Sequence, residues 1–124
     1  MPLVQRFEDL RIWQEARELV KLIYQDFGKG TPGQHDYGFK GQIQDAGVSI
    51  MNNTSEGFEK RSRADSARFY DIAKGSAGEV RNMYYIAEDI QYVTPEVALD
   101  RRTRAESISK GLAAYTRDVR SKIK

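Results

Sequence analysis

Residues 46 to 90, AGVSIMNNTSEGFEKRSRADSARFYDIAKGSAGEVRNMYYIAEDI, decide the fold of this chain. On either side of a short basic turn around Arg61, apolar residues recur every three or four positions, the period of an α-helix with one buried face. The pattern predicts two amphipathic helices, over about 37–59 and 63–91. Two long helices joined by a short turn are antiparallel neighbours. The pair needs further helices to cover its apolar side.

The sequence before this stretch predicts another helix. From Phe7 to Phe27, apolar residues recur at helical intervals, which predicts a helix over about 9–27. It ends where the glycines of residues 28–36 begin, because glycine and proline disfavour helix. The single histidine of the chain, His35, lies in this loop.

A fourth helix follows the stretch. Thr94-Pro95-Glu96 combines a capping threonine, a proline at the first helical position and an acid in the first turn. These signals predict a helix over about 95–122. No segment alternates with the period of a strand. The sequence therefore predicts an all-α fold, an antiparallel up-down-up-down four-helix bundle that forms a single domain over residues 1–124.

Length and composition are those of one soluble domain. The chain has 124 residues, of which 31% are charged and 40% hydrophobic, so it is too apolar for a disordered chain. The absence of cysteine excludes disulfides and thiolate metal sites. The start of the chain lacks the pattern of a signal peptide, and no apolar run is long enough to span a membrane. We therefore expect a cytoplasmic protein with no membrane partner.

The net charge of +2 is unevenly distributed. Residues 1–59 carry six Lys and Arg against nine Asp and Glu, whereas residues 60–124 carry fourteen against nine. The basic residues gather at the turn between the central helices, early in the last helix and at the end of the chain: Lys60, Arg61, Arg63, Arg68, Arg101, Arg102, Arg104, Arg117, Arg120, Lys122 and Lys124. Such clusters attract phosphate groups. The alternative is that they are solvated helix faces and helix-end charges.

Polar residues interrupt the apolar line of the central helices at Asn53, Glu56, Ser76 and Glu79. If the turn centres on Arg61, the first two lie beside the turn, and the last two lie roughly 10 Å or more away along the helix axis. The sequence therefore predicts two polar levels instead of one site.

A buried carboxylate needs a charged or hydrogen-bonding partner. Arg63 or Arg68 is the expected partner of Glu56. We interpret the polar residues as positions that fix helix register or a subunit contact, as they do in coiled coils. The alternative is a ligand site.

Glycines of the central helices suggest close packing. The same register places Gly47 opposite Gly75 and Gln44 opposite Gly78. Each glycine costs about 1 kcal/mol of helix propensity relative to alanine, so we interpret them as points of backbone contact. The alternative is tolerated weakness in an exposed face.

Three motifs carry a resemblance to a known family. They are Phe7-x-x-Leu10-x-x-Trp13-Gln14-x-Ala16, Gln42-Ile43-x-x-Ala46-x-x-Ser49-Ile50-x-x-Asn53-x-x-Glu56-Gly57 and Ala73-x-Gly75-Ser76-x-x-Glu79. Together, over about residues 7–93, they resemble the four-helix-bundle family of proteins encoded in intervening sequences of 23S ribosomal RNA genes. Met51 stands where the family often has proline and Thr54 where it has isoleucine, which affects the second helix more than the fold.

The resemblance implies a bundle that assembles into a ring-shaped homo-oligomer, commonly a homopentamer, with no established enzymatic activity. Some relatives resemble accessory proteins of diversity-generating retroelements, which pair with a reverse transcriptase and bind nucleic acid through a basic surface. The residues that the motifs assign to packing and assembly are Asn53, Glu56, Gly57, Gly75, Ser76 and Glu79.

Catalytic and metal-binding patterns are missing from the sequence. Lys74-Gly75-Ser76 lacks the glycine that a nucleophile elbow needs two positions before its serine. One histidine cannot supply a metal triad, and the Glu-x-x-His pattern of di-metal bundles does not occur. We therefore expect no enzyme, no metal, no cofactor and no small-molecule substrate.

Two functions fit these observations. The first is a homo-oligomeric, pentameric bundle that binds RNA, or an RNA-handling partner such as a reverse-transcriptase-like protein. Its predicted nucleic-acid contacts are Lys60, Arg61, Arg63, Arg68, Arg101, Arg102, Arg104, Arg117 and Arg120. The second is a purely structural scaffold that docks a protein through aromatic anchors, namely Tyr84, Tyr85 and Tyr92.

Overall fold

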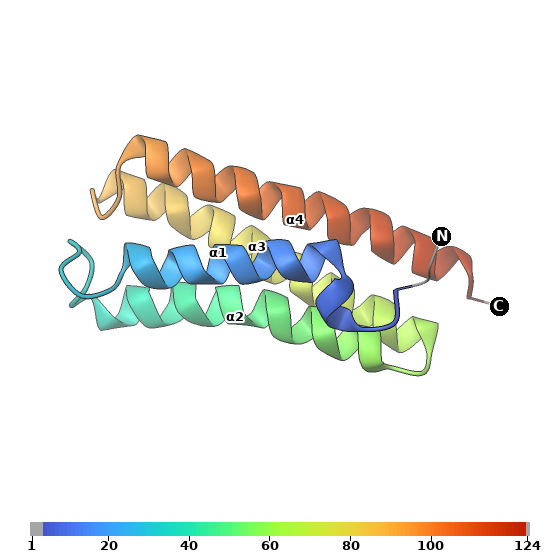
Figure 1. The fold of residues 1–124 in the computed structure, drawn as a ribbon. Helices are drawn as coiled ribbons and strands as arrows, with labels where there is room; N and C mark the ends of the chain where they lie inside the picture. Colours follow the sequence, from blue (N-terminus) through green and yellow to red (C-terminus); the bar gives the residue numbers. More distant parts are fainter. Residues whose placement is uncertain (1–3, 124) are drawn as a thin grey trace.

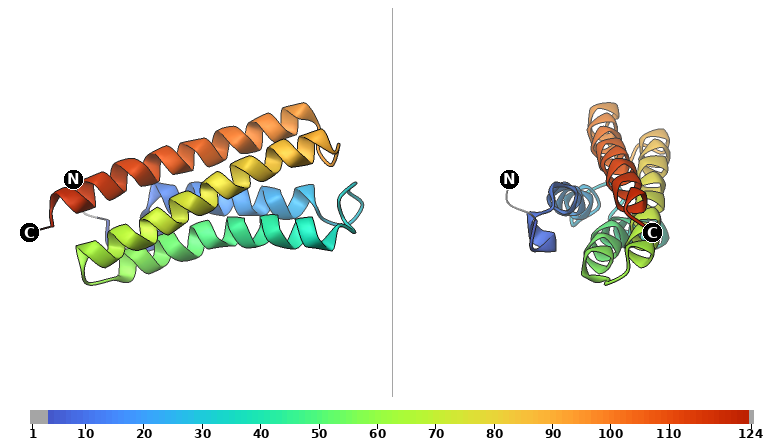
Figure 2. Two further views of the ribbon diagram at one scale, coloured as in Figure 1. Left: turned by 180° about the vertical axis from the view of Figure 1, so that it is seen from behind. Right: turned by 90° about the vertical axis from the view of Figure 1, so that its right-hand side faces the viewer.

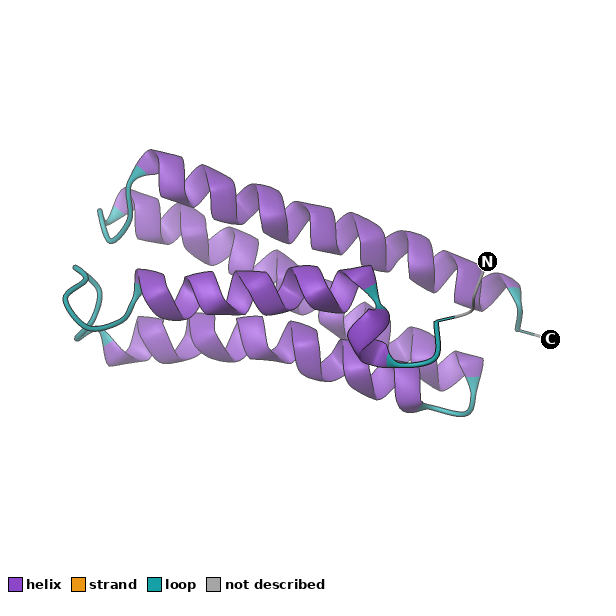
Figure 3. Ribbon diagram, in the orientation of Figure 1, coloured by secondary structure: helices purple, strands orange, loops and turns teal. Residues whose placement is uncertain are grey.

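The structure, a computed structural model, describes residues 4–123. The elements run in the order η1 (Phe7–Asp9, a 3-10 helix), α1 (Arg11–Asp26), α2 (Tyr37–Glu59), α3 (Arg63–Asp89) and α4 (Pro95–Ser121). Only helices and loops occur in this part of the chain (Figure 3). The predicted all-α fold with four α-helices is confirmed, and each predicted helix end lies within two residues of its observed position.

Each α-helix runs antiparallel to the next, and the four surround a common axis (Figures 1 and 2). The most extensive packing joins α3 to α4 and to α2, and α1 completes the bundle against α2 and α4. The α2–α3 turn, residues 60–62, lies at the same end as the last turn of α4, and we call this the turn end (Figure 1). The α1–α2 and α3–α4 loops lie at the opposite end, the loop end (Figure 1).

Side-chain caps fix the starts of three helices. The Asp36 carboxylate accepts a hydrogen bond from the Phe39 backbone N–H at the start of α2. The hydroxyls of Ser62 and Thr94 accept equivalent bonds in α3 and α4, which satisfies backbone groups that a helix start leaves free. The first helix begins later than predicted, because Leu10 adopts an extended conformation and is buried between η1 and α1.

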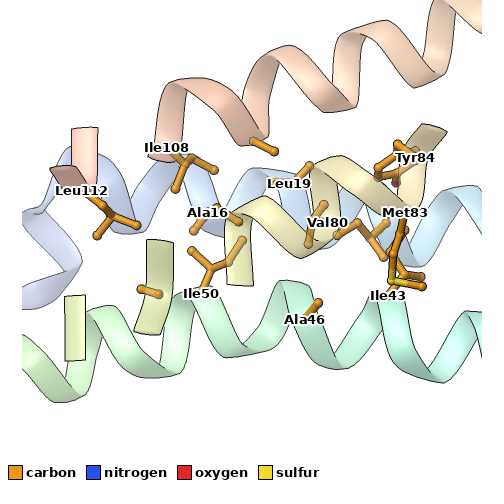
Figure 4. Packing of buried hydrophobic residues seen from close by; sticks show 14 of the residues in the cluster. Ala16, Leu19, Ile43, Ala46, Ile50, Val80, Met83, Tyr84, Ile108 and Leu112 are labelled. Atoms are coloured by element: carbon orange, nitrogen blue, oxygen red, sulfur yellow. The ribbon is translucent and has the colours of Figure 1, made fainter. Parts of the chain in front are cut away.

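The core is one apolar cluster to which all four α-helices contribute (Figure 4). Burying this surface is the main favourable term of folding. The largest of its fully buried aliphatic side chains are Leu19, Ile23, Ile43, Ile50, Val80, Ile108 and Leu112. Helix α3 adds two large aromatic side chains, Tyr70 and Tyr84, which are 2% and 0% exposed.

The glycines pack differently from the sequence prediction. A Cβ atom on Gly75 or Gly78 would meet nothing within 4 Å, and one on Gly47 would meet Ile23 of α1. The predicted contact of Gly47 and Gly75 across α2 and α3 is therefore wrong. The close approach of these helices lies at Gly57, where a Cβ would stand 2.6 Å from the Cε1 atom of Tyr70.

At the loop end, two tyrosine–aspartate contacts hold the ends of the α1–α2 loop. The Tyr84 hydroxyl donates to Asp26 at 2.8 Å, and the Tyr92 hydroxyl donates to Asp36 at 2.7 Å. Asp26 also accepts two hydrogen bonds from Arg101 of α4, both 2.8 Å long. The hydrogen bond from Tyr92 lowers the pKa of Asp36.

Candidate nucleic-acid interface

The turn end brings together six of the nine cations that the sequence predicts as nucleic-acid contacts. Four come from the α2–α3 turn and the start of α3, and two from the last turns of α4, because α4 returns antiparallel to α3 (Figure 2). The Arg63 Nη1 donates a hydrogen bond to the Lys122 carbonyl at 3.1 Å, which ties the two segments together. The six are Lys60, Arg61, Arg63, Arg68, Arg117 and Arg120. Lys124 lies outside the described residues.

Three of these arginines carry uncompensated charge. Arg61, Arg63 and Arg117 are exposed, and within residues 4–123 no carboxylate lies within the 4 Å that defines an ion pair with them. A cleft of about 550 Å³ at the turn end is lined by Arg61, Arg63 and Lys122, together with Ser62, Ala64 and Ile123. Unpaired guanidinium groups beside a cleft are suited to bind phosphate oxygens, because each offers several donors in one plane.

Two further cations are held loosely. Lys60 Nζ lies 3.6 Å from Glu56, and Arg68 Nη2 lies 3.8 Å from Asp65. Exposed pairs at such distances contribute little to stability, so both cations are available to a stronger anion. The partner predicted for Glu56 is therefore corrected: the carboxylate is exposed and faces Lys60, and not Arg63 or Arg68.

A second groove, of about 390 Å³, runs between α3 and α4 beside the turn end. Its lining includes Asp71, Lys74, Arg117 and Arg120. Arg120 forms a two-pronged ion pair with Asp71, and these hydrogen bonds raise the pKa of Arg120. Lys74 was not among the predicted contacts. Its position follows from the register of α3 and α4. Asp71 lies beside Arg120, and Lys74 lies one turn further along α3.

The three arginines early in α4 do not belong to this surface. They lie toward the loop end, and each is engaged within the subunit. Their partners are Asp26 for Arg101 at 2.8 Å, Glu88 for Arg102 at 2.7 Å and Asp100 for Arg104 at 2.9 Å. The side chains of Arg101 and Arg102 are only 13% and 14% exposed. The structure therefore removes Arg101 and Arg102 from the candidate interface. Arg104 is 42% exposed in an exposed pair with Asp100, so its charge is accessible, but it lies toward the loop end and away from the other cations.

The polar motif residues line the outer seam of α2 and α3. Asn53 Nδ2 donates to Ser49 Oγ at 3.0 Å, and Ser49 Oγ shares a 2.7 Å hydrogen bond with Ser76 Oγ. Gln42 donates to Glu79, which is exposed. Asn53 and Ser76 therefore belong to one chain of hydrogen bonds, which corrects the prediction of two separate levels.

Comparison with known proteins identifies the family. A family model described as 23S rRNA-intervening sequence protein matches residues 8–114. This chain belongs to that family. The match covers α1, α2, α3 and most of α4, so the resemblance predicted from the three motifs is confirmed.

A solved relative supports the fold of this family member. It is a protein of unknown function from the S23 ribosomal protein family of Bacteroides thetaiotaomicron VPI-5482. The two structures align with a TM-score of 0.77 at 23% sequence identity, over 85% of this chain and 97% of the relative. At that identity the likeness concerns the fold. A search of curated proteins finds no match.

Residues 4–123 of this family member contain neither a cluster of metal ligands nor a membrane-spanning helix. Between residues 4 and 123, no three His, Cys, Asp or Glu side chains lie together as metal ligands would. In the same part of the chain, no helix combines the length and the apolar character that a bilayer crossing requires.

Proposed function

We propose that this member of the family is a cytoplasmic, non-enzymatic protein that forms a pentameric ring and binds RNA through its turn end. One observation carries the binding proposal: Arg61 and Arg63, which line the cleft at the turn end, and Arg117, which lines the neighbouring α3–α4 groove, have no carboxylate partner among the described residues. The family description refers to 23S rRNA, and the Bacteroides relative is described as a member of the S23 ribosomal protein family, so RNA is the nucleic acid that we propose.

The outer face of α3 supports the proposal of assembly. Ile72 and Ile86 of this helix, and Ile90 at its C-terminal cap, are each more than 40% exposed. The motif residue Gly75 lies on the same outer side with open space above it, so nothing in the subunit requires a glycine there. Exposed apolar side chains beside small residues suit a contact between copies. A ring would also repeat the basic turn end around one rim, which offsets the modest +2 charge of each chain.

The first test is a salt titration of RNA binding. Wild-type protein is expected to bind single-stranded RNA with an affinity whose logarithm falls linearly with the logarithm of the salt concentration. Replacing Arg61, Arg63 and Arg117 together with glutamine is expected to reduce the magnitude of that slope by about 2, since each contact with single-stranded RNA contributes about 0.7. Filter binding between 50 and 300 mM salt, over which the Debye length shortens about 2.4-fold, measures both slopes.

The control variant removes the same charge elsewhere. Arg17, Lys21 and Lys29 are exposed on α1 and the α1–α2 loop, and replacing all three with glutamine should leave the slope unchanged. An equal loss of slope in both triple variants would show that only net charge matters and would contradict a site at the turn end. No retention of RNA by wild type at low salt would overturn RNA binding altogether.

Assembly has its own test. Light scattering at micromolar concentration is expected to give a mass near five times the chain mass of 14.2 kDa. Replacing Ile86 with glutamate would place a charge on the exposed face of α3 and is expected to shift the mass toward that of one chain. A wild-type mass near 14.2 kDa would contradict the proposed ring.

A protein-docking scaffold is the second candidate, and Tyr85 favours it. This side chain is 50% exposed, with the Arg102 guanidinium 4.1 Å from its ring. The other two predicted anchors are corrected: Tyr84 is fully buried, and Tyr92 is partly buried and bonded to Asp36. Partners that copurify after nuclease treatment, and are lost on Tyr85→Ala, would support the scaffold.

A further inference from the structure

Phe69 is an aromatic side chain of the turn end that the subunit core does not explain. It lies in the second turn of α3 and is partly exposed, whereas its neighbour Tyr70 points into the core and is 2% exposed. Within residues 4–123, Phe69 is neither a member of the buried cluster nor one of the partly buried side chains packed against it. The apolar core therefore does not account for an aromatic ring at this position.

Two cations lie against this ring. Lys60 Nζ is 4.9 Å and the Arg68 guanidinium carbon 4.8 Å from its centroid. Their own carboxylate partners are exposed and lie at 3.6 and 3.8 Å, so neither cation is fixed by a strong ion pair. Both long side chains are free to turn toward phosphate groups and to leave the ring accessible. An aromatic ring beside mobile cations is the combination that single-stranded nucleic acids bind.

We propose that Phe69 is a stacking platform for an unpaired base, and that Lys60 and Arg68 bind the phosphates on either side of that nucleotide. The turn end then prefers single-stranded RNA to duplex RNA. This inference rests on the proposed binding of RNA at the turn end and adds the structural class of the ligand.

The preference follows from the accessibility of bases. In A-form RNA the bases are stacked on each other within the helix, so a protein ring can stack only on an unpaired or terminal base. A single strand exposes the faces of its bases, and every base offers a π-face, so stacking tolerates different sequences. Unpaired Arg61 and Arg63 contribute charge to either form and do not discriminate.

The test compares Phe69→Leu with Phe69→Tyr. Fluorescence anisotropy with a labelled 12-nucleotide single strand and the corresponding duplex, at fixed low salt, gives both affinities. Wild type is expected to bind the single strand about tenfold more tightly. Phe69→Leu, which keeps an apolar side chain without a π-face, is expected to lose about tenfold in single-strand affinity and to leave duplex affinity unchanged. Phe69→Tyr is expected to retain the wild-type preference.

The matched control is Tyr85→Leu. Tyr85 is also an exposed aromatic residue of α3 with an arginine against its ring, but it lies toward the loop end. Its replacement is expected to change neither affinity. Photo-crosslinking of wild type to a 5-iodouridine oligonucleotide supplies a readout that needs no variant to fold, and the crosslinked peptide is expected to contain Phe69.

The two proposals fail in different ways. If wild type binds RNA with a salt-dependent affinity but Phe69→Leu binds the single strand as wild type does, the stacking inference is overturned and RNA binding stands. The same holds if Phe69→Leu weakens duplex and single strand equally. If wild type binds neither RNA at low salt, both proposals are overturned.

Discussion

Replacing Arg101 with methionine is expected to lower the free energy of unfolding by about 3–5 kcal/mol, because it leaves a buried carboxylate without its counter-charge. Asp26 is 9% exposed and accepts two hydrogen bonds from the Arg101 guanidinium. The same hydrogen bonds raise the pKa of Arg101, so the arginine is charged at every accessible pH. After the substitution, only the Tyr84 hydroxyl would still donate to Asp26 among the contacts of this cluster.

Arg120→Met is the matched control on the same helix. Arg120 also forms a two-pronged ion pair, but it and its partner Asp71 are 52% and 48% exposed. Water screens such a pair, so we expect a loss of no more than about 1 kcal/mol. Urea denaturation followed by circular dichroism, at one protein concentration because assembly would add stability, measures both variants. Similar losses for the two variants would contradict a special role for the buried pair.

A double variant separates the ion pair from packing. Adding Asp26→Asn to Arg101→Met removes the buried charge and keeps an acceptor for Tyr84. The double variant should therefore be more stable than the sum of the single losses predicts, with a coupling of about 1–3 kcal/mol. Single-strand RNA affinity is expected to stay at the wild-type value in Arg101→Met, because the guanidinium already lies within the subunit.

The contrast between Arg101 and Arg61 shows that the sequence does not reveal which arginines are paired within the subunit. Both residues sit in basic clusters, and the clusters looked equally suited to phosphate. Whether a cation is free depends on which carboxylate the fold places beside it, and Asp26 is 75 residues from Arg101 in sequence. A charge pattern in the sequence shows how many cations one helix carries. Which of them form ion pairs depends on the register between that helix and its neighbours.

The buried face of α3 was likewise predicted only in part. A heptad through Ala73, Val80 and Ala87 predicts the buried face of this helix correctly, since all three are fully buried. The sequence does not show which positions beside this heptad are buried, because aromatic or apolar residues occur on both sides of it. The structure buries Tyr84, which the sequence predicts as a surface anchor, and leaves Ile90, the last residue of the heptad line, 47% exposed. Helix α3 packs against both α2 and α4, so its buried face is wider than a simple heptad line.

The helix boundaries were predictable because their signals are local. A threonine or serine that caps the next turn acts within four residues, and a glycine-rich loop disfavours helix wherever it occurs. The glycines inside the helices are different. The sequence shows that a side chain is absent there, but it does not show which residue of another helix occupies the space. Gly57 and Gly75 look alike in sequence and stand in opposite surroundings.

Those surroundings predict opposite effects for the same substitution. Gly57→Ala is expected to lower the free energy of unfolding by about 2 kcal/mol, as overpacking of a core does. The new methyl group would lie 2.6 and 2.9 Å from two ring carbons of Tyr70 and 3.1 Å from the Ser66 carbonyl oxygen. The ring cannot move away easily, because Tyr70 is 2% exposed and packs against Tyr115 with their centroids 5.1 Å apart.

Gly75→Ala is expected to raise the free energy of unfolding by about 0.5–1 kcal/mol, since alanine favours helix and its Cβ would meet nothing within 4 Å. Urea denaturation of both variants against wild type measures the difference, and equal stabilities would contradict the packing at Gly57. Light scattering of Gly75→Ala then asks a separate question. A variant that is more stable as a subunit but no longer assembles would mean that the glycine serves the contact between copies, because the subunit itself leaves that space empty.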